Sequence, residues 1–358
     1  MKYIINDKKY HFKSAFDTVT GAYVRTGVLD ENGKDTGVDP FMASFPHLID
    51  VGVMGHCIHG KTGLCAKAGI GCYQSGLLIE EPNMTVEDFE WIAKQCEGRC
   101  NQLALGGRGD PDQHEHFEDL LRISRKYNLV PNFTTSGYGM TKELAMLCKK
   151  YCGAVAVSWY RNEYTLKAIN LLLEVGIKTN IHYVLGKNSI DEAIDRLQTN
   201  SFPKGINAVI FLLHKPAGQG TKDNMLNVND PKVKKFFEEF DKRHPFKVGM
   251  DSCTVPGAIK FCKNVMMESL DTCEGGRYSC YISADMYMTP CSFDQKKEYY
   301  VSLKDKTIEG IWNSEKFNKF RNRMEHACPN CDKKELCKGG CPLMPEIVIC
   351  DSKDRKVE

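Results

Sequence analysis

Six apolar segments alternate with six amphipathic segments between residues 47 and 250. The apolar segments read LIDVGVM, QLALGG, LVPNFTT, AVAVSW, KTNIHYVLG and INAVIFLLH, and each precedes a stretch with the periodicity of an amphipathic helix. Repeated strand–helix units favour a parallel sheet with helices on its outer side. A closed (β/α) barrel needs eight such units. We therefore predict an α/β fold in which residues 47–250 form a partial (β/α)6 TIM barrel.

Two flanking regions lack this alternation. Residues 1–46 contain the short strand-like runs KYIIN and AYVRTGVL around the turn DENGK, which predicts a small N-terminal β appendage. Residues 251–358 are rich in cysteine and form the third expected domain. Ligands of parallel α/β folds bind at the carboxyl ends of the strands, so the loops after the strands are the expected place for a site.

The charge of the chain is balanced, with 48 Lys and Arg residues against 46 Asp and Glu residues and a formal net charge of +2. This balance provides no basic field that would attract nucleic acid or an anionic membrane surface. No apolar run is long enough to span a bilayer, and the first residues turn polar too soon for a signal peptide. We therefore expect a cytoplasmic protein that binds neither nucleic acid nor membrane.

The cysteine content is the main functional clue. Seventeen cysteines in a reducing compartment are hard to explain as disulfides, and closely spaced thiolates then indicate metal binding. The segment CPNCDKKELCKGGC spaces its four cysteines by two, five and three residues, and such thiolates can meet at one or two metal centres. Spacing alone leaves zinc as the alternative to iron–sulfur. Eight ligands, as two four-iron clusters require, are available at Cys273, Cys280, Cys291, Cys328, Cys331, Cys337, Cys341 and Cys350.

The loop after the first predicted strand, GHCIHGKTGLCAKAGIGCYQSG, holds three further cysteines among several glycines. Gaps of seven and six residues separate Cys57, Cys65 and Cys72. A long Gly-rich loop can still bring three thiolates to one centre, because each added residue costs little loop entropy. The alternatives are a zinc knuckle with His56 or His59 as fourth ligand, and a phosphate cradle, which is disfavoured because no Gly-Lys-Ser/Thr ending is present.

Over residues 47–350 the chain resembles radical S-adenosylmethionine (SAM) enzymes with a C-terminal SPASM domain. The resemblance implies three [4Fe-4S] clusters and SAM as cofactors. Cys57, Cys65 and Cys72 would hold the SAM-cleaving cluster, although the usual family loop spaces its cysteines by three and two residues. The implied ligands of the first auxiliary cluster are Cys273, Cys280, Cys291 and Cys341, and those of the second are Cys328, Cys331, Cys337 and Cys350. Cys253 or Cys262 could replace Cys280.

The resemblance also implies residues that contact SAM. LGGRGDP resembles the family's Gly-Gly-Glu-Pro motif after the second strand, with Gly106 and Gly107 in place and Asp110 as the acidic residue. Without the family, the same residues form a glycine turn at the end of a strand. Tyr73 follows the third loop cysteine, as an aromatic residue commonly does. Ser158 is a candidate ribose or carboxylate contact, whereas His182 is a weaker candidate because a buried histidine more often belongs to the core.

The implied activity is cleavage of SAM to a 5′-deoxyadenosyl radical, followed by oxidative modification of a ribosomally made peptide or protein. The sulfatase-maturing branch has an acidic residue directly after the cysteine that matches Cys291; here Ser292 stands there and Asp294 is the nearest candidate proton acceptor. This departure favours a cross-link or thioether over alcohol oxidation. We expect a reductant such as flavodoxin or ferredoxin and, unless the β appendage holds the substrate, a separate leader-binding partner. The alternatives are a sulfatase-maturase-like or small-molecule radical SAM oxidoreductase, and a non-catalytic zinc or iron–sulfur binding module.

Overall fold

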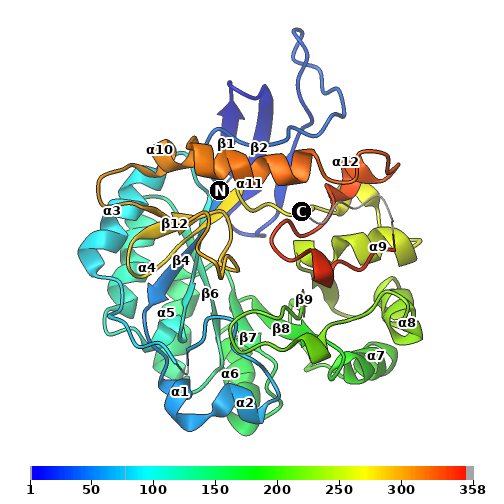
Figure 1. The fold of residues 1–358 in the computed structure, drawn as a ribbon. Helices are drawn as coiled ribbons and strands as arrows, with labels where there is room; N and C mark the ends of the chain where they lie inside the picture. Colours follow the sequence, from blue (N-terminus) through cyan, green and yellow to red (C-terminus); the bar gives the residue numbers. More distant parts are fainter. Residues whose placement is uncertain (1, 77, 352–358) are drawn as a thin grey trace.

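One ten-stranded sheet dominates the computed structural model, which describes residues 2–76 and 78–351 (Figure 1). The strand order is β10-β9-β8-β7-β6-β5-β4-β11-β12-β13. Neighbouring strands from β4 to β10 are all parallel. These strands are β4 (Leu48–Met54), β5 (Gln102–Gly107), β6 (Val130–Thr135), β7 (Val155–Ser158), β8 (Thr179–Leu185), β9 (Ala208–Leu213) and β10 (Lys247–Met250). The predicted α/β fold with a partial barrel is confirmed.

Six helices follow the strands and form an arc outside the sheet (Figure 1). Polar residues at their N-termini explain where several of them begin, because side-chain oxygens of Thr85, Thr141, Asn162 and Asp230 accept backbone N–H groups of the first turn. Each helix buries its apolar residues against the strands. The helices are α3 (Val86–Cys96), α4 (Phe117–Lys126), α5 (Lys142–Tyr151), α6 (Glu163–Glu174), α7 (Ile190–Thr199) and α8 (Pro231–Phe240).

The cysteine-rich region continues the same sheet beyond β4, which the sequence pattern did not predict. β11 (Ser279–Ile282) pairs in parallel with β4, and β12 (Tyr287–Thr289) and β13 (Val301–Ser302) follow in antiparallel pairing. Gly52 of β4 permits this, because a Cβ atom there would collide with the Tyr281 hydroxyl. The remaining helices are α9 (Val255–Phe261), α10 (Ile308–Trp312), α11 (Glu315–Glu325) and α12 (Lys334–Cys337).

The N-terminal appendage is an antiparallel sheet of β1 (Lys2–Asp7), β2 (Phe12–Asp17) and β3 (Tyr23–Arg25) that stands apart from the barrel (Figure 1). The sequence pattern predicted strands near β1 and β3 but missed β2. In β2 the buried Phe12, Ser14 and Phe16 alternate with more exposed residues. Because Ser14 is polar, the alternation of apolar and polar residues that indicates a strand is weak in this segment.

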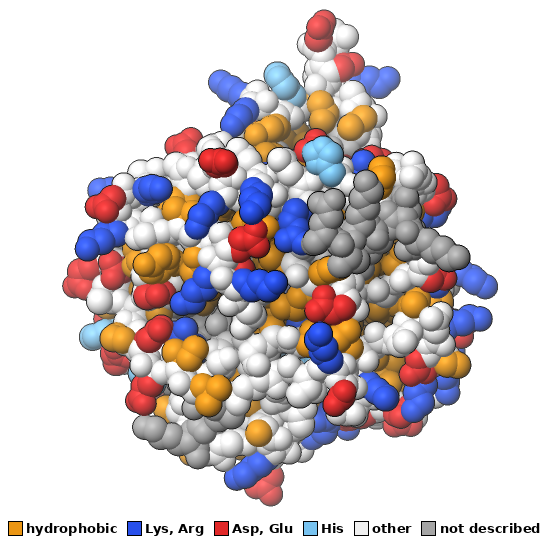
Figure 2. Space-filling model, in the orientation of Figure 1, with side chains coloured by type: hydrophobic (Ala, Val, Ile, Leu, Met, Phe, Trp, Pro, Cys, Tyr) orange, Lys and Arg blue, Asp and Glu red, His pale blue; other side chains and the backbone are white. Residues whose placement is uncertain are grey.

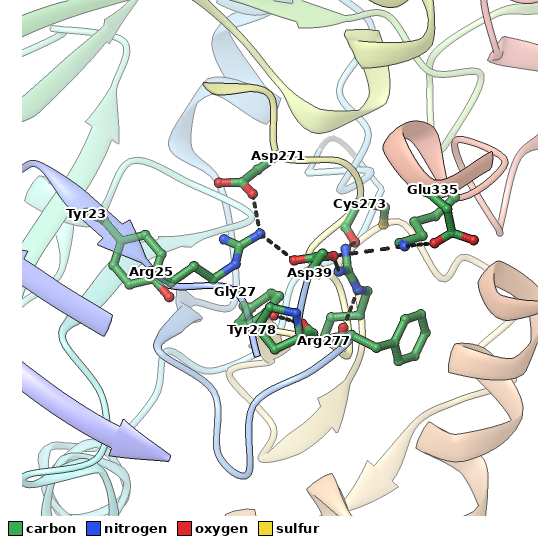
Figure 3. A network of polar contacts seen from close by, with 12 residues as sticks. Tyr23, Arg25, Gly27, Asp39, Asp271, Cys273, Arg277, Tyr278 and Glu335 are labelled. Carbon is green, nitrogen blue, oxygen red and sulfur yellow. Dashed lines mark hydrogen bonds and ion pairs between the residues drawn. The ribbon is translucent and has the colours of Figure 1, made fainter. Parts of the chain in front are cut away.

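A polar network joins this appendage to the cysteine-rich region (Figure 3). Arg25 pairs with Asp271 at 2.5 Å and with Asp39 at 3.3 Å. Arg277 is 1% exposed, pairs with Asp39 at 2.7 Å and donates to the Phe41 carbonyl at 2.6 Å. The appendage is therefore anchored through ion pairs, of which the buried Arg277 most needs its partner.

The surface offers no strongly charged region on the face shown in Figure 2, where Lys and Arg side chains lie among Asp and Glu side chains. Within residues 2–76 and 78–351, no helix has the length and apolar character that crossing a bilayer requires.

Candidate functional site

The loop after β4 places three cysteines around one cavity at the carboxyl end of the parallel strands. Cys57 precedes α1 (Ile58–Thr62), Cys65 lies in α2 (Leu64–Lys67), and Cys72 follows. These loop cysteines line a cavity of about 280 Å³ together with His59 and Gln219. The structure thus brings together the three thiols that the sequence analysis grouped.

Glycines let the loop fold back on itself so closely. A Cβ atom at Gly76 would lie 3.0 Å from the Cys57 Cβ and 2.8 Å from the Arg108 carbonyl oxygen. Gly63, with φ 64°, ends α1 in the left-handed conformation and allows α2 to begin at once. The amide of Gln219 donates to the Cys72 carbonyl at 2.9 Å and so closes the cavity from the loop after β9.

Electrostatics couple the loop cysteines. Burial raises the pKa of Cys65 to about 11, the Tyr160 hydroxyl at 3.3 Å opposes that shift, and the charges of Cys57 and Cys72 add to it. Without a cation the thiol of Cys65 is therefore protonated at neutral pH. Binding of a metal or cluster would have to release this proton.

The residues around the cavity fit a bound group. Two buried acceptors that line the cavity, His59 Nδ1 and Gln219 Oε1, have no hydrogen-bond partner among the described residues. Each such atom costs about 1–3 kcal/mol unless a partner arrives. In the described part of the chain, no three Cys, His, Asp or Glu side chains are grouped to hold one metal ion. Each iron of a four-iron cluster takes its own thiolate, so thiols that ring a cavity suit a cluster.

Asp110 lies beside this cavity in an unexpected arrangement. Its Oδ2 atom lies 2.8 Å from His59 Nε2 and accepts the Ser136 hydroxyl at 2.5 Å, while Oδ1 accepts the Ser136 amide at 3.0 Å. Because a carboxylate only accepts, His59 Nε2 carries the proton and Nδ1 keeps its lone pair. The sequence analysis missed Ser136, since nothing in the local pattern around β6 marks it.

Of the other predicted SAM contacts, Gly106, Gly107 and Ser158 lie at the carboxyl ends of their strands, and His182 lies within β8. Gly106 and Gly107 end β5, and Gly107 has φ 117° where a side chain would collide with the backbone of Met54. Ser158 ends β7 and pairs in register with His182 of β8. Burial lowers the pKa of His182 to about 4, so the ring is neutral at pH 7, and its Nδ1 lies 3.2 Å from the Thr134 hydroxyl.

Tyr73 connects the loop cysteines to the cysteine-rich region. Its ring stacks on Phe293 with centroids 4.3 Å apart, and burial raises the pKa of its hydroxyl. Phe293 lies two residues after Cys291. The two cysteine-rich parts of the molecule therefore meet through an aromatic contact.

A second group of thiols forms where four distant segments meet. Cys253 interacts with Cys341 through a hydrogen bond between their side chains, and the charges of Cys253 and Cys273 act on each other and on Cys291. Burial raises the pKa of Cys273 to about 12, and Cys253 contributes to the shift. We call Cys253, Cys273, Cys291 and Cys341 the inner cysteine group.

Cys280 lies apart from the inner cysteine group. It is on β11, is 2% exposed, and interacts with Cys100 and Cys96. Cys253, one of the two substitutes considered, interacts with members of that group. The other, Cys262, contacts the Phe237 carbonyl at 3.8 Å instead. The strand β11 fixes Cys280 on the sheet, a constraint that spacing could not reveal.

Of the other predicted cluster ligands, Cys328 and Cys331 precede α12, Cys337 ends it, and Cys350 follows the 3-10 helix Pro345–Ile347. Three consecutive residues between Cys337 and Cys341 have positive φ angles, and Cys328 itself has φ 47°. A Cβ atom at Gly339 would meet the Cys328 sulfur at 3.9 Å, and one at Gly340 would meet Val348, two residues before Cys350. We call Cys328, Cys331, Cys337 and Cys350 the outer cysteine group.

Asp294 is not placed as a free proton acceptor. Its side chain is buried, and its oxygens accept the amides of Glu298 at 3.2 Å and Tyr299 at 2.8 Å. The Thr289 hydroxyl completes the set at 3.4 Å. Asp294 thus closes a turn after Cys291, a role that its position in the sequence did not reveal.

Comparisons with known proteins agree with this architecture. Residues 273–338 match the family model of the SPASM iron–sulfur cluster-binding domain. The fold is similar to Streptococcus suis SuiB bound to S-adenosylmethionine, with TM-score 0.65, 15% identity, and coverage of 88% of this chain and 78% of that chain. SuiB bound to precursor peptide SuiA gives TM-score 0.68 at 13% identity over 100% of both chains.

A further solved structure, native anSMEcpe with bound AdoMet, matches with TM-score 0.57 and 18% identity over 83% of this chain and 89% of that chain. No curated protein sequence matches the chain. The chain therefore contains a match to the SPASM domain and shares its fold, a partial barrel, with SuiB and anSMEcpe, both solved with SAM bound. The predicted resemblance is confirmed at this level.

Proposed function

We propose that this protein is a radical SAM enzyme that oxidatively modifies a peptide or protein. The observation that carries the proposal is that the loop cysteines line one cavity at the carboxyl end of the parallel strands. A cluster held there with SAM would supply a 5′-deoxyadenosyl radical. The SPASM match and the shared fold with SAM-bound structures support the same cofactors.

The chain's own residues would hold, orient and shield these cofactors. The loop cysteines provide three thiolates and leave one iron of a four-iron cluster without a protein thiolate. Asp110 and Ser136 hold His59 against the cavity, and the neutral His182 adds no charge to the barrel interior. The segment around Gln219 covers the loop and restricts the access of water to the cavity.

We assign two auxiliary clusters to the inner and outer cysteine groups, which makes three clusters in all. Cys253 rather than Cys280 is assigned to the first, because the side chain of Cys253 interacts with that of Cys341, whereas Cys280 lies on β11. Iron analysis tests the assignment. Cys253→Ala should lose about four of about twelve irons, whereas the matched variant Cys280→Ala should keep all of them. Equal iron contents of the two variants would contradict it.

A peptide substrate is the favoured class, since SuiB, of similar fold, binds the precursor peptide SuiA. The carboxylate of Asp294 already accepts two backbone amides and so is not available as a base near the inner cysteine group. Because alcohol oxidation would need such a base, a cross-link or thioether is the favoured product. A reductant such as flavodoxin or ferredoxin would deliver the electron. Either the β appendage or a separate partner would hold the leader of the peptide.

The decisive experiment uses reconstituted, reduced protein with SAM and measures 5′-deoxyadenosine. Cys65→Ala should abolish the product, because one cluster ligand is lost. Cys148→Ala is a suitable control, since Cys148 is a fully buried cysteine of α5 whose thiol is not part of the cavity. A protein that binds zinc without iron, or product formation that persists in Cys65→Ala, would refute the proposed function.

A further inference from the structure

Lys215 is a buried cation beside segments that carry the inner cysteine group. It follows β9 and is 8% exposed. Its Nζ atom lies 2.7 Å from Asp251 Oδ2, donates to the Leu213 carbonyl at 3.1 Å, and lies 4.6 Å from the centre of the Phe293 ring. Burying a charged group is costly, so this lysine is held by specific contacts.

The neighbours of Lys215 belong to the inner cysteine group or adjoin it. Asp251 begins the short 3-10 helix Ser252–Thr254 that carries Cys253, and Phe293 is two residues beyond Cys291. The ammonium also interacts electrostatically with the sulfurs of Cys253, Cys291 and Cys341. Lys215 therefore interacts electrostatically with three of the four cysteines of the inner cysteine group.

The ion pair with Asp251, at 2.7 Å, favours the charged form of Lys215. The fourth inner cysteine, Cys273, instead experiences Arg277, whose guanidinium donates to the Cys273 carbonyl at 3.3 Å. Positive charge therefore flanks the inner cysteine group from two directions, and Asp251 and Asp39 partly offset it.

A fixed positive charge has a defined effect on an iron–sulfur cluster. Reduction adds one electron, and the added negative charge is spread over the cluster and its sulfur ligands. A nearby cation in a medium of low dielectric stabilises the reduced form more than the oxidised form. Net charge around the sulfurs is one of the factors that set cluster potentials.

We infer that Lys215 is a positioning residue that raises the reduction potential of the first auxiliary cluster, and so favours transfer of one electron from the substrate-derived radical to that cluster. The inference rests on the proposed function and on the assignment of the inner cysteine group. In this step the substrate-derived radical loses one electron and is oxidised, the cluster gains the same electron and is reduced, and Lys215 keeps its protons.

A redox titration followed by electron paramagnetic resonance tests this inference. Each cluster gives one reduction step, or wave, in the titration. The wave of the first auxiliary cluster is the one that the wild type shows and Cys253→Ala lacks. Lys215→Met removes the charge and keeps a side chain of similar length, and it should shift this wave to a more negative potential. Asp251→Asn removes the offsetting negative charge and should shift the same wave in the positive direction.

Two further variants separate charge from structure. Lys215→Arg keeps the charge and should stay near the wild-type potential. Lys142→Met disrupts another Lys–carboxylate pair, the one 2.7 Å from Glu174 on the outer helices, and should shift nothing.

An unchanged wave in Lys215→Met, or shifts of the same sign in Lys215→Met and Asp251→Asn, would overturn the inference while the proposed function stands. A wild-type protein without iron–sulfur signals would remove the proposed function and the inference with it.

Discussion

The loop cysteines come from one continuous loop, whereas the inner cysteine group assembles from segments spread over residues 253–341. In the first site, glycines and two short helices bring the thiols together locally. In the second, the position of each thiol depends on the strand or turn that carries it. A local site can be found from sequence even when its spacing is unusual, but an assembled site depends on the register of the whole sheet.

The largest expected effect is on the site formed by the loop cysteines, and only on that site. Gly76→Val should eliminate 5′-deoxyadenosine formation and about four of about twelve irons, because its Cβ would press on the backbone of Arg108 and on Cys57. Iron analysis should show that the auxiliary clusters remain. Gly249→Ala is the control, since the only neighbour of its Cβ is the flexible end of Ile210. Loss of all clusters in Gly76→Val would mean that the two sites do not form independently.

The next effect concerns the assembled region. Arg277→Met should lower the free energy of unfolding by about 3 kcal/mol, because it leaves Asp39 without its buried partner. Chemical denaturation followed by tryptophan fluorescence would measure the change. Lys319→Met breaks the exposed pair with Glu298 and should leave the unfolding transition in place. If both variants unfold alike, the network in Figure 3 does not hold the appendage.

An effect of intermediate size is the pH dependence of the free energy of unfolding that His182 of the barrel causes. His182 has its pKa lowered from 6.5 to about 4 by burial, so its stabilising contribution is complete above pH 6.5 and is lost as the pH falls toward 4. Between pH 7 and pH 5 this histidine should cost the wild type about 2 kcal/mol. His182→Gln cannot titrate, and its unfolding free energy should vary less over the same interval. Parallel pH profiles of the two proteins would contradict the assignment.

The smallest expected effect is on the rate of 5′-deoxyadenosine formation when Asp110, which orients His59 of the loop, is changed. Asp110→Asn keeps the shape of the side chain but removes the charge that orients His59 and accepts two hydrogen bonds from Ser136. We expect 5′-deoxyadenosine formation to fall about tenfold, the scale found when partners behind a metal site are changed. Asp119→Asn, on the exposed surface of α4, should have no effect. A wild-type rate in Asp110→Asn would show that the His59 contact is dispensable.

Periodicity found much of this fold because its elements are strongly patterned. The six apolar segments became β4 to β9, since a strand buried on both faces reads as a continuous apolar run. The short strands β10 and β11 were missed, because KVGM and SCYI are too brief to show a period. The domain boundaries at residues 46 and 250 stay predictions.

The candidate site was predictable where side chains are close in sequence. The loop cysteines were grouped from their position after β4, and the structure places them around one cavity, whereas the roles of Gly106 and Gly107 at the end of β5 stay predictions. Ser136 and Gln219 were not predicted, because they reach the cavity from the ends of other strands and carry no local signature. The hydrogen bonds that Asp294 accepts could not be predicted, because its partners Glu298 and Tyr299 are defined only by the turn they form with it.

The sequence by itself determined the type of architecture, the presence of clustered thiols and the strand after which the first three occur. Short-range periodicity and spacing are properties of the chain before it folds. Only the tertiary structure decided that Cys253 and not Cys280 joins the inner cysteine group, and that Lys215 faces it. The position of Cys280 follows from the parallel pairing of β11 with β4, and the positions of Cys253 and Lys215 follow from the course of the chain after β9 and β10. These contacts join residues that are too distant in sequence to leave a local pattern.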